Sequence, residues 1–346
     1  MKIYSSIIAA TVLCSSIYAQ PIAKEDGFSG FVAAGVTTMK YESNMYAGTQ
    51  FDDKMTDEKI DSIDGSADSE SSTQPSFNFN VKYTFADAQT EIYLGTLLED
   101  AITFDSTAIL GVRKHFDGVG IFALGLLGSS VPTKTYKDPY KTGSDRGSTD
   151  MTSSGISLKW EGIMDSNFDV ELRARKYDID GGDKSGQDGT YHGDNGDRTI
   201  TSSQADELDR EGDLSQLIMA YRWNINKRNH LRTAIRLSDY DLDGKAMEHT
   251  RTGIKLDYLY LGDKWNFVAV MGAAKDKFDN GNPLYNYKKA DADTFGGAFT
   301  AMYKNPFNIA ENLSLTATVA AYNYDSDIDF YDGKVTMLNL GVLYKF

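Results

Sequence analysis

The clearest pattern along this chain is a two-residue alternation of apolar and polar side chains. From Phe77 to Phe85 every odd position is aromatic or valine, whereas the even positions carry Asn, Lys or Thr. Alternation with this period is typical of a strand whose two faces meet different surroundings. The same pattern returns over the last thirteen residues and ends on Phe346. We therefore predict strands with one apolar face and one polar face.

Segments of this kind recur about every twenty residues, and their length of roughly ten residues is what a strand needs to cross a lipid bilayer. The pattern predicts an all-β fold: a transmembrane, antiparallel, up-and-down β-barrel of about fourteen strands, within a range of twelve to sixteen. An even number is expected because a closed barrel leaves no backbone group unpaired in lipid. The strands are expected near 28–40, 76–85, 90–98, 101–115, 121–131, 151–160, 168–177, 214–224, 230–240, 250–261, 265–277, 292–304, 313–324 and 334–346.

Short and long connections alternate between these segments. Those at 86–89, 117–120 and 226–229 are short, whereas residues 42–75 and 178–213 form long loops. Short periplasmic turns and long external loops are the usual asymmetry of such barrels. The two long loops have net charges of -7 and -8, which together equal the formal net charge of -15, so the rest of the chain is neutral overall. A chain this acidic is a poor nucleic-acid binder, because phosphates would be repelled.

The first nineteen residues have the layout of a secretory signal peptide. Lys2 precedes an apolar run from Ile3 to Leu13, and Ala19 supplies a small residue at the expected cleavage site. The apolar run is too short for a membrane-spanning helix. We therefore expect residues 1–19 to be a cleaved signal peptide and residues 20–346 to be a single barrel domain. Cys14 is the single cysteine, so this domain has no disulfide, thiolate zinc site or thiol nucleophile.

The terminal Phe346, preceded by alternating apolar residues, resembles the C-terminal signature of Gram-negative outer-membrane barrels, which their assembly machinery recognises. The resemblance implies export through the periplasm to the outer membrane. The expected partners are the assembly machinery, with Phe346 as the assembly signal, and the lipid and lipopolysaccharide of that membrane.

Several stretches together resemble one family, the domain of unknown function numbered 2860, whose members are exported proteins of Gram-negative bacteria. The similarity spans nearly all of the chain after the leader, and it implies no activity, cofactor or site residues. The stretches are Glu25 to Phe31, Glu42 to Asn44 with Ala47-Gly48, Leu94 to Phe116, Asp138 to Tyr140, Asn282 to Tyr285 and Asp325 to Phe346.

Charged residues on three consecutive predicted strands are the main candidates for a functional site. A guanidinium group is costly on the lipid-facing side, so these arginines are expected to face the lumen. There they would narrow a pore and favour anions. The alternative is that they pair with neighbouring acids, such as Asp169, and only stiffen the barrel. The predicted pore-lining residues are Arg173, Arg175, Arg222, Arg232, Arg236 and Glu171.

Two other kinds of chemistry are weaker candidates. Aspartates in the loops offer oxygen ligands for divalent cations, in the groups Asp178/Asp180/Asp183, Asp241/Asp243 and Asp325/Asp327/Asp329, but none matches an EF-hand. His192 and His249 are expected at the outer rim, and His249 could pair with Asp241 or Asp243 as an acid and base. No nucleophile motif accompanies them, so we expect neither an enzyme nor a cofactor.

Tyrosine and tryptophan near strand ends fit the aromatic girdle that marks the water boundary of membrane barrels. The residues assigned to it are Tyr221, Trp223, Tyr258, Tyr260, Trp265, Tyr303 and Tyr344. The sequence thus favours a porin-like channel for passive passage of small polar solutes. The alternative is a non-conducting surface barrel whose acidic loops bind cations, lipopolysaccharide or another partner.

Overall fold

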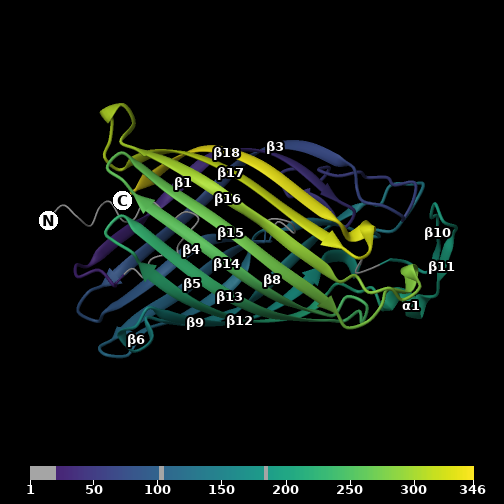
Figure 1. The fold of residues 1–346 in the computed structure, drawn as a ribbon, viewed down its shortest axis with the longest axis horizontal. Helices are drawn as coiled ribbons and strands as arrows, with labels where there is room; N and C mark the ends of the chain where they lie inside the picture. The colour runs from purple at the N-terminus through teal and green to yellow at the C-terminus, as the bar shows by residue number, and fades with distance from the viewer. Residues whose placement is uncertain (1–20, 101–104, 183–185) are drawn as a thin grey trace.

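A computed structural model describes residues 21–100, 105–182 and 186–346, and fourteen long antiparallel strands form a single barrel wall within it (Figure 1). The first wall strand begins and the last one ends at the same end of the barrel, here called the terminal end, and the long loops lie at the other, the loop end. The wall strands are β1 (Gly27–Ser43), β3 (Ser69–Phe85), β4 (Thr90–Asp100), β5 (Asp105–Phe116), β6 (Gly120–Val131), β8 (Ser148–Glu161), β9 (Phe168–Ile179), β12 (Gly212–Asn224), β13 (Asn229–Leu242), β14 (His249–Leu261), β15 (Trp265–Phe278), β16 (Ala292–Lys304), β17 (Leu313–Ser326) and β18 (Gly333–Lys345).

The barrel closes because its first strand pairs with its last. β1 and β18 are antiparallel over thirteen residue pairs, from Phe31 opposite Lys345 to Ser43 opposite Gly333. Beyond this ladder, Phe346 and Gly30 exchange two backbone hydrogen bonds of 3.0 and 3.2 Å. Closure pairs the backbone that would otherwise form two sheet edges, as a hydrocarbon environment requires. The fold is therefore a transmembrane barrel of the outer-membrane type.

Side chains alternate strictly between the two faces of the wall. On β18, Leu338, Leu340 and Val342 point outward and are 42 to 56% exposed, whereas Val335 and Leu343 point inward and are fully buried. The aromatic residues assigned to a girdle lie on the outer face at the terminal end. Tyr221 contacts Trp223 with ring centroids 4.7 Å apart, and Trp265 contacts Tyr303 at 4.8 Å.

The predicted strands are confirmed as fourteen wall strands, with ends that mostly differ by up to four residues; β3 begins seven residues earlier than predicted, at Ser69, within the stretch expected to be a loop. The predicted segment 101–115 begins outside the described residues at 101–104, and β5 is seen from Asp105. The leader, 1–19, also lies outside the described residues. Within the described residues, no helix is both long and apolar enough to cross a membrane.

Two short strands extend the wall at the loop end and were not predicted. β2 (Tyr46–Thr49) pairs with β7 (Thr133–Tyr136), and β7 pairs with β8, so the sheet has sixteen strands in all. A hairpin of β10 (Gly189–Tyr191) and β11 (Arg198–Ile200) stands apart from this sheet, followed by helix α1 (Ser202–Asp206). Strands of three or four residues are too short to display an alternation, which explains why the sequence pattern did not predict them.

Small residues on the inner face allow one aromatic ring to lie across neighbouring strands. A Cβ atom at Gly111 on β5 would lie 2.5 Å from the hydroxyl of Tyr93, and one at Gly125 on β6 would lie 3.3 Å from it. Tyr93 of β4 therefore covers two glycines on the next two strands.

Replacing Gly111 with valine is expected to displace Tyr93 and destabilise the barrel by roughly 1–3 kcal/mol, because the wall cannot absorb the added atoms. The midpoint of urea unfolding in lipid vesicles measures this effect. Gly128→Ala on β6 is the control, because a Cβ there meets nothing within 4 Å. An equal loss of stability in both variants would contradict the packing argument.

Candidate functional site

Charged side chains on the inner face gather on one side of the barrel. Most of them lie on β4 to β15. The inner faces of β1 and β17 carry none, and those of β3, β16 and β18 carry only Glu70, Lys82, Lys304 and Lys345. Among the described residues, twelve basic and eight acidic side chains point inward, so the lining is positive overall. The basic residues are Lys82, Arg113, Lys159, Arg173, Arg175, Arg222, Arg232, Arg236, Arg251, Lys255, Lys304 and Lys345, and the acidic ones are Glu70, Glu91, Asp105, Glu161, Asp169, Glu171, Asp257 and Asp276.

Near the terminal end, ion pairs link three strands, β4, β5 and β8. Arg113 of β5 lies between Glu91 of β4 at 2.7 Å and Glu161 of β8 at 2.8 Å. Glu161 also accepts from Lys159, at 3.1 Å. Both glutamate side chains are more than nine-tenths buried. A charge in such a place is stable only with its partner present, so the cluster fixes this part of the wall.

Arg222 and Arg232 face one another across the β12–β13 ladder, at the same terminal end. Arg222 pairs with Asp169 of β9 at 2.8 Å, and Arg232 pairs with Asp257 of β14 at 3.2 Å. Each arginine thus reaches sideways to an acid on the next strand, and the two like charges remain adjacent.

Towards the loop end, two arginines are each held by both oxygens of one aspartate. Arg175 of β9 contacts Asp105 of β5 at 2.7 and 2.8 Å. Arg251 of β14 contacts Asp276 of β15 at 2.6 and 2.7 Å. Tyr177 donates to the same aspartate as Arg175, at 3.1 Å. Bidentate pairing of this kind fixes the plane of the guanidinium group.

The structure places all six predicted pore-lining residues on the inner face. The arginines do not form a simple ladder: Arg173 donates to Glu171 at 2.5 Å, and Arg175, Arg222 and Arg232 have the carboxylate partners given above. Arg113, Arg251 and the inward lysines were missed, because only three neighbouring strands were considered. The same alternation test applied to β5 and β14 would have found both arginines.

Away from the terminal end, where Lys82, Lys304 and Lys345 point inward, the opposite wall is lined mainly by uncharged polar groups. The side-chain amide of Asn339 on β18 donates to Thr37 at 2.7 Å and to Ser76 at 2.6 Å. Thr300 and Thr318 on β16 and β17 share a hydrogen bond of 2.8 Å. The lumen therefore has a side rich in charged groups and a side whose middle part carries hydroxyl and amide groups.

The loops at the loop end pack together around one hydrophobic cluster, here called the loop cap. It draws on residues 44–68, 132–147, 186–211, 243–248, 279–291 and 327–332, with neighbouring strand ends. Its loops rise from opposite sides of the ring of strands, so the cap reaches across the mouth, at the right of Figure 1. The buried members are Met45, Ile63, Tyr140, Tyr191, Ile200, Ala205, Leu208, Leu242, Ala246, Met247, Phe278, Leu284, Ala290, Ile328 and Phe330.

A buried arginine joins two loops of the cap. Arg146, only 2% exposed, donates to the carbonyl oxygens of Asn44 at 2.8 Å and Pro139 at 3.1 Å, and also to that of Asp57. Its guanidinium lies 3.7 Å from the centre of the Tyr136 ring. Contacts of this kind satisfy a buried charge with carbonyl dipoles and an aromatic face.

Tyrosine hydroxyls and acids complete the polar contacts of the cap. Tyr140 and Tyr331 share a hydrogen bond of 2.5 Å, and burial raises the pKa of Tyr140 to about 12. Tyr191 donates to Asp138 at 3.1 Å. Burial also raises the pKa of Asp138, although hydrogen bonds from Tyr140, Tyr191 and Gln187 oppose this effect.

The other candidate chemistry finds little support in the arrangement of side chains. The ring of His249 lies between Tyr240 and Phe278, and its Nδ1 is 2.8 Å from the carbonyl oxygen of Met247 rather than beside Asp241 or Asp243. His192 pairs with Asp197 at 2.8 Å on the surface. Asp183 lies outside the described residues. Asp243 lies beside Asp209 and Glu211, close enough for three oxygens to share one cation.

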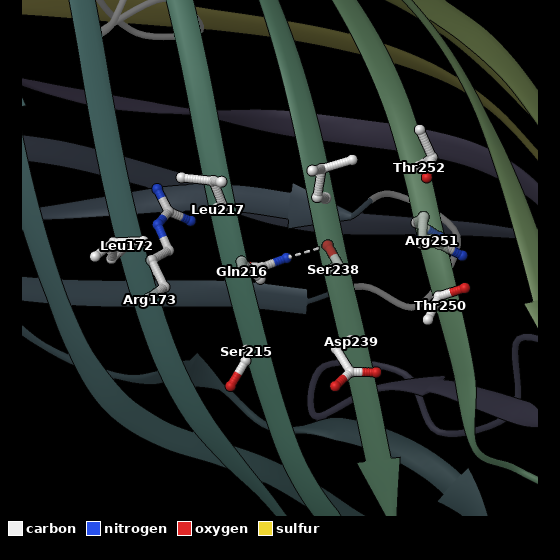
Figure 2. A pocket seen from close by; sticks show the side chains of 11 residues that line it. Leu172, Arg173, Ser215, Gln216, Leu217, Ser238, Asp239, Thr250, Arg251 and Thr252 are labelled. Carbon is white, nitrogen blue, oxygen red and sulfur yellow. Dashed lines mark hydrogen bonds between the residues drawn. The ribbon is translucent and has the colours of Figure 1, made fainter.

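A hollow of about 490 Å³ lies against the wall that β9, β12, β13 and β14 form (Figure 2). At its centre, the amide of Gln216 donates to the hydroxyl of Ser238 at 3.1 Å, across the β12–β13 ladder. Both side chains point inward and are more than nine-tenths buried.

Comparison with known proteins gives one family and a set of distant folds. The model of the family DUF2860, described as a protein of unknown function, matches residues 27–345. No curated protein matches the sequence. Similar solved structures include OmpT, an outer membrane protein of Vibrio cholerae (12% identity, TM-score 0.41, 94% of this chain and 100% of that one). Another is a Pseudomonas aeruginosa FadL homologue (12% identity, TM-score 0.47, 95% of this chain and 93% of that one). A third is an anion-selective porin from Comamonas acidovorans (9% identity, TM-score 0.41, 93% of this chain and 100% of that one). At such low identity, what these proteins do is not carried over to this chain.

Proposed function

The chain belongs to the DUF2860 family, whose description assigns no activity, and we propose from the geometry of its lumen that it is a porin-like channel of the outer membrane. It is exported with residues 1–19 as a signal peptide, and residues 20–346 form one barrel domain with the loop cap outside the cell. Small polar solutes pass through it passively, without catalysis.

The observation that carries this proposal is the excess of basic side chains on the inner face. In a channel of low internal dielectric, such an excess raises the local concentration of anions and lowers that of cations. Most of the excess lies at the terminal end, where Arg222 and Arg232 are adjacent and Lys304 and Lys345 also point inward. We therefore expect a modest preference for anions, and we expect the terminal end, which faces the periplasm in this proposal, to determine it.

Current through the refolded protein in a planar bilayer tests the proposal. In a potassium chloride gradient, the reversal potential should show chloride passing more readily than potassium. The double variant Arg222→Gln/Arg232→Gln removes two positive charges and should move the reversal potential towards that of potassium. Arg222→Gln/Asp169→Asn is the matched control, because it removes one pair of opposite charges and leaves the net charge unchanged.

The outcome separates this proposal from the second candidate, a surface barrel that does not conduct. The extensive packing of the loop cap favours that alternative, because loops from opposite sides meet across the mouth. A folded protein with no measurable conductance would overturn the channel and leave cation, lipopolysaccharide or partner binding by the acidic loops as the function. A cation preference in the wild type would contradict the role of the basic lining.

Phe346 is expected to act as the assembly signal. Its backbone forms hydrogen bonds with Gly30 where β1 and β18 close the barrel, and its side chain is 43% exposed on the outer face. Phe346→Ala should lower the yield of folded barrel in the outer membrane several-fold while leaving refolding from urea into lipid vesicles nearly unchanged. A comparable loss in both measurements would show that Phe346 stabilises the barrel itself rather than directing its assembly.

A further inference from the structure

Four inward side chains form a row across the charged wall, below the loop cap. Arg173 on β9 lies opposite Gln216 on β12, Gln216 opposite Ser238 on β13, and Ser238 opposite Arg251 on β14. Three strand spacings separate its ends, a span of roughly 15 Å. Figure 2 shows the four strands side by side with these residues along them. A small solute in the lumen can therefore touch most of the row at once.

The middle of the row holds an acceptor that no residue of the described part of the chain satisfies. Gln216 is 7% exposed and donates its Nε2 to Ser238, whereas its Oε1 is buried and has no hydrogen-bond partner among residues 21–100, 105–182 and 186–346. An unmet buried acceptor is costly, and most such groups in folded proteins find a partner. A hydroxyl group of a bound solute would supply the missing donor.

The charges at the two ends of the row are already balanced. Arg173 donates to Glu171, and Arg251 is held by both oxygens of Asp276. An anion at the row would meet these carboxylates and the Gln216 oxygen, while a cation would meet the two guanidinium groups. A solute without net charge avoids both repulsions.

Two tyrosine rings lie beside the same arginine. The guanidinium of Arg251 is 5.9 Å from the ring centre of Tyr240 and 6.0 Å from that of Tyr324. Both tyrosines point inward and are partly buried. A ring face of this kind packs against the apolar C–H face of a cyclic solute, and the hydroxyl and amide groups of the opposite wall suit the same solute.

From this arrangement we propose that the row is a binding subsite for a neutral polyhydroxylated solute of the size of a hexose, with Gln216 as its specificity-determining residue. The subsite rests on the proposed function, since a solute reaches the row only if it enters the lumen. The subsite refines that function: small ions pass along the positive lining, while neutral sugars bind transiently at the row during passage.

Equilibrium dialysis against the refolded, full-length protein in micelles tests the subsite with three probes of one carbon skeleton: glucose, gluconate and glucosamine. Glucose should bind saturably, and at least tenfold more tightly than the anion or the cation. Gln216→Leu should weaken glucose binding by roughly three- to tenfold, because one buried hydrogen bond contributes about that factor to a binding constant. Gln74→Leu is the matched control, because that inward glutamine on β3 already accepts from Thr49 at 2.7 Å.

Gln216→Glu keeps the shape of the side chain and provides a second test where the leucine variant does not fold. It should bind glucosamine more tightly than glucose. Equal binding of all three probes, tightest binding of gluconate, or no binding by a protein that conducts potassium chloride would overturn the subsite and leave the channel in place. Glucose binding that depends on Gln216 in a barrel without conductance would keep the subsite and overturn the channel.

Discussion

Replacing Arg146 with alanine should raise the fraction of time that the channel is open by up to about a hundredfold. The change removes three hydrogen bonds to buried carbonyl groups and the contact with Tyr136. A loss of roughly 3 kcal/mol is expected from such charged donors, and this corresponds to about two powers of ten in the equilibrium between packed and open loops. Single-channel recording of the refolded variant measures the open fraction directly.

Two controls accompany this experiment. Arg146→Lys retains the charge but not the planar set of donors, so an intermediate open fraction is expected. Arg228→Ala removes a half-exposed arginine from a turn at the terminal end, where it pairs with Asp263, and it should have no effect. If Arg146→Ala makes the loops sensitive to protease but leaves the current unchanged, the loop cap does not control access to the lumen.

Acidification on the loop side should close the channel. Burial raises the pKa of Asp138, and it also raises those of Asp57 and Asp332, in two other loops of the cap. A carboxyl group with a raised pKa in the packed state takes up a proton more readily there than in open loops. The packed cap is therefore most stable below the ordinary aspartate pKa of about 4, and this stabilisation is lost as the pH rises through the raised values.

The pKa of Asp64 is shifted in the opposite direction, and this shift works against the closure of the channel in acid. Burial of this carboxyl group acts to raise the pKa, but hydrogen bonds from Asn195 and Arg198 outweigh burial and hold the pKa below its usual range. Three carboxyl groups favour closure in acid and this one opposes it. The expected net result is a fall in open fraction as the pH is lowered from 7 towards 4.5 on the loop side.

Asp138→Asn tests the assignment of this pH dependence. The amide resembles the protonated acid, so the variant should show a lower open fraction at neutral pH and a weaker response to acid. Asp61→Asn is the control, because the Asp61 side chain is 94% exposed. An unchanged pH response in Asp138→Asn, or an equal response when only the terminal side is acidified, would rule out the cap as its origin.

The barrel could be predicted from the sequence because its determinant is local. Each wall strand carries its own alternation, as in Phe77 to Phe85, and the lipid on one side and the polar lumen on the other require it. The inward direction of Arg173 or Arg222 follows from the same rule. Their partners do not: the pairing of Arg175 with Asp105 joins β9 to β5, and sequence spacing alone does not bring these strands together.

The loop cap could not be predicted for a related reason. Its cluster joins Met45, Tyr140 and Phe330, which lie in three loops without any periodic pattern. Arg146 looked like an ordinary loop residue, yet it holds two loops together through backbone carbonyl groups, which sequence identity does not reveal. The unmet acceptor of Gln216 is visible only once Ser238 is placed beside it.

Because six loops share one hydrophobic core, insertions and substitutions in one loop of this surface affect the packing of the others. Where external loops are independent, each tolerates insertions and foreign epitopes separately. Here an insertion near Leu284 or Phe330, both fully buried, would disturb neighbours that rise from the far side of the ring. The tip of the β10–β11 hairpin lies outside the main sheet, is largely exposed and adds no side chain to the buried cluster of the described residues; its backbone contacts the polar side chains of Ser62 and Asp64 through the hydrogen bonds of Asp194 and Asn195. Display of added peptides, and natural sequence drift, should therefore concentrate at that hairpin.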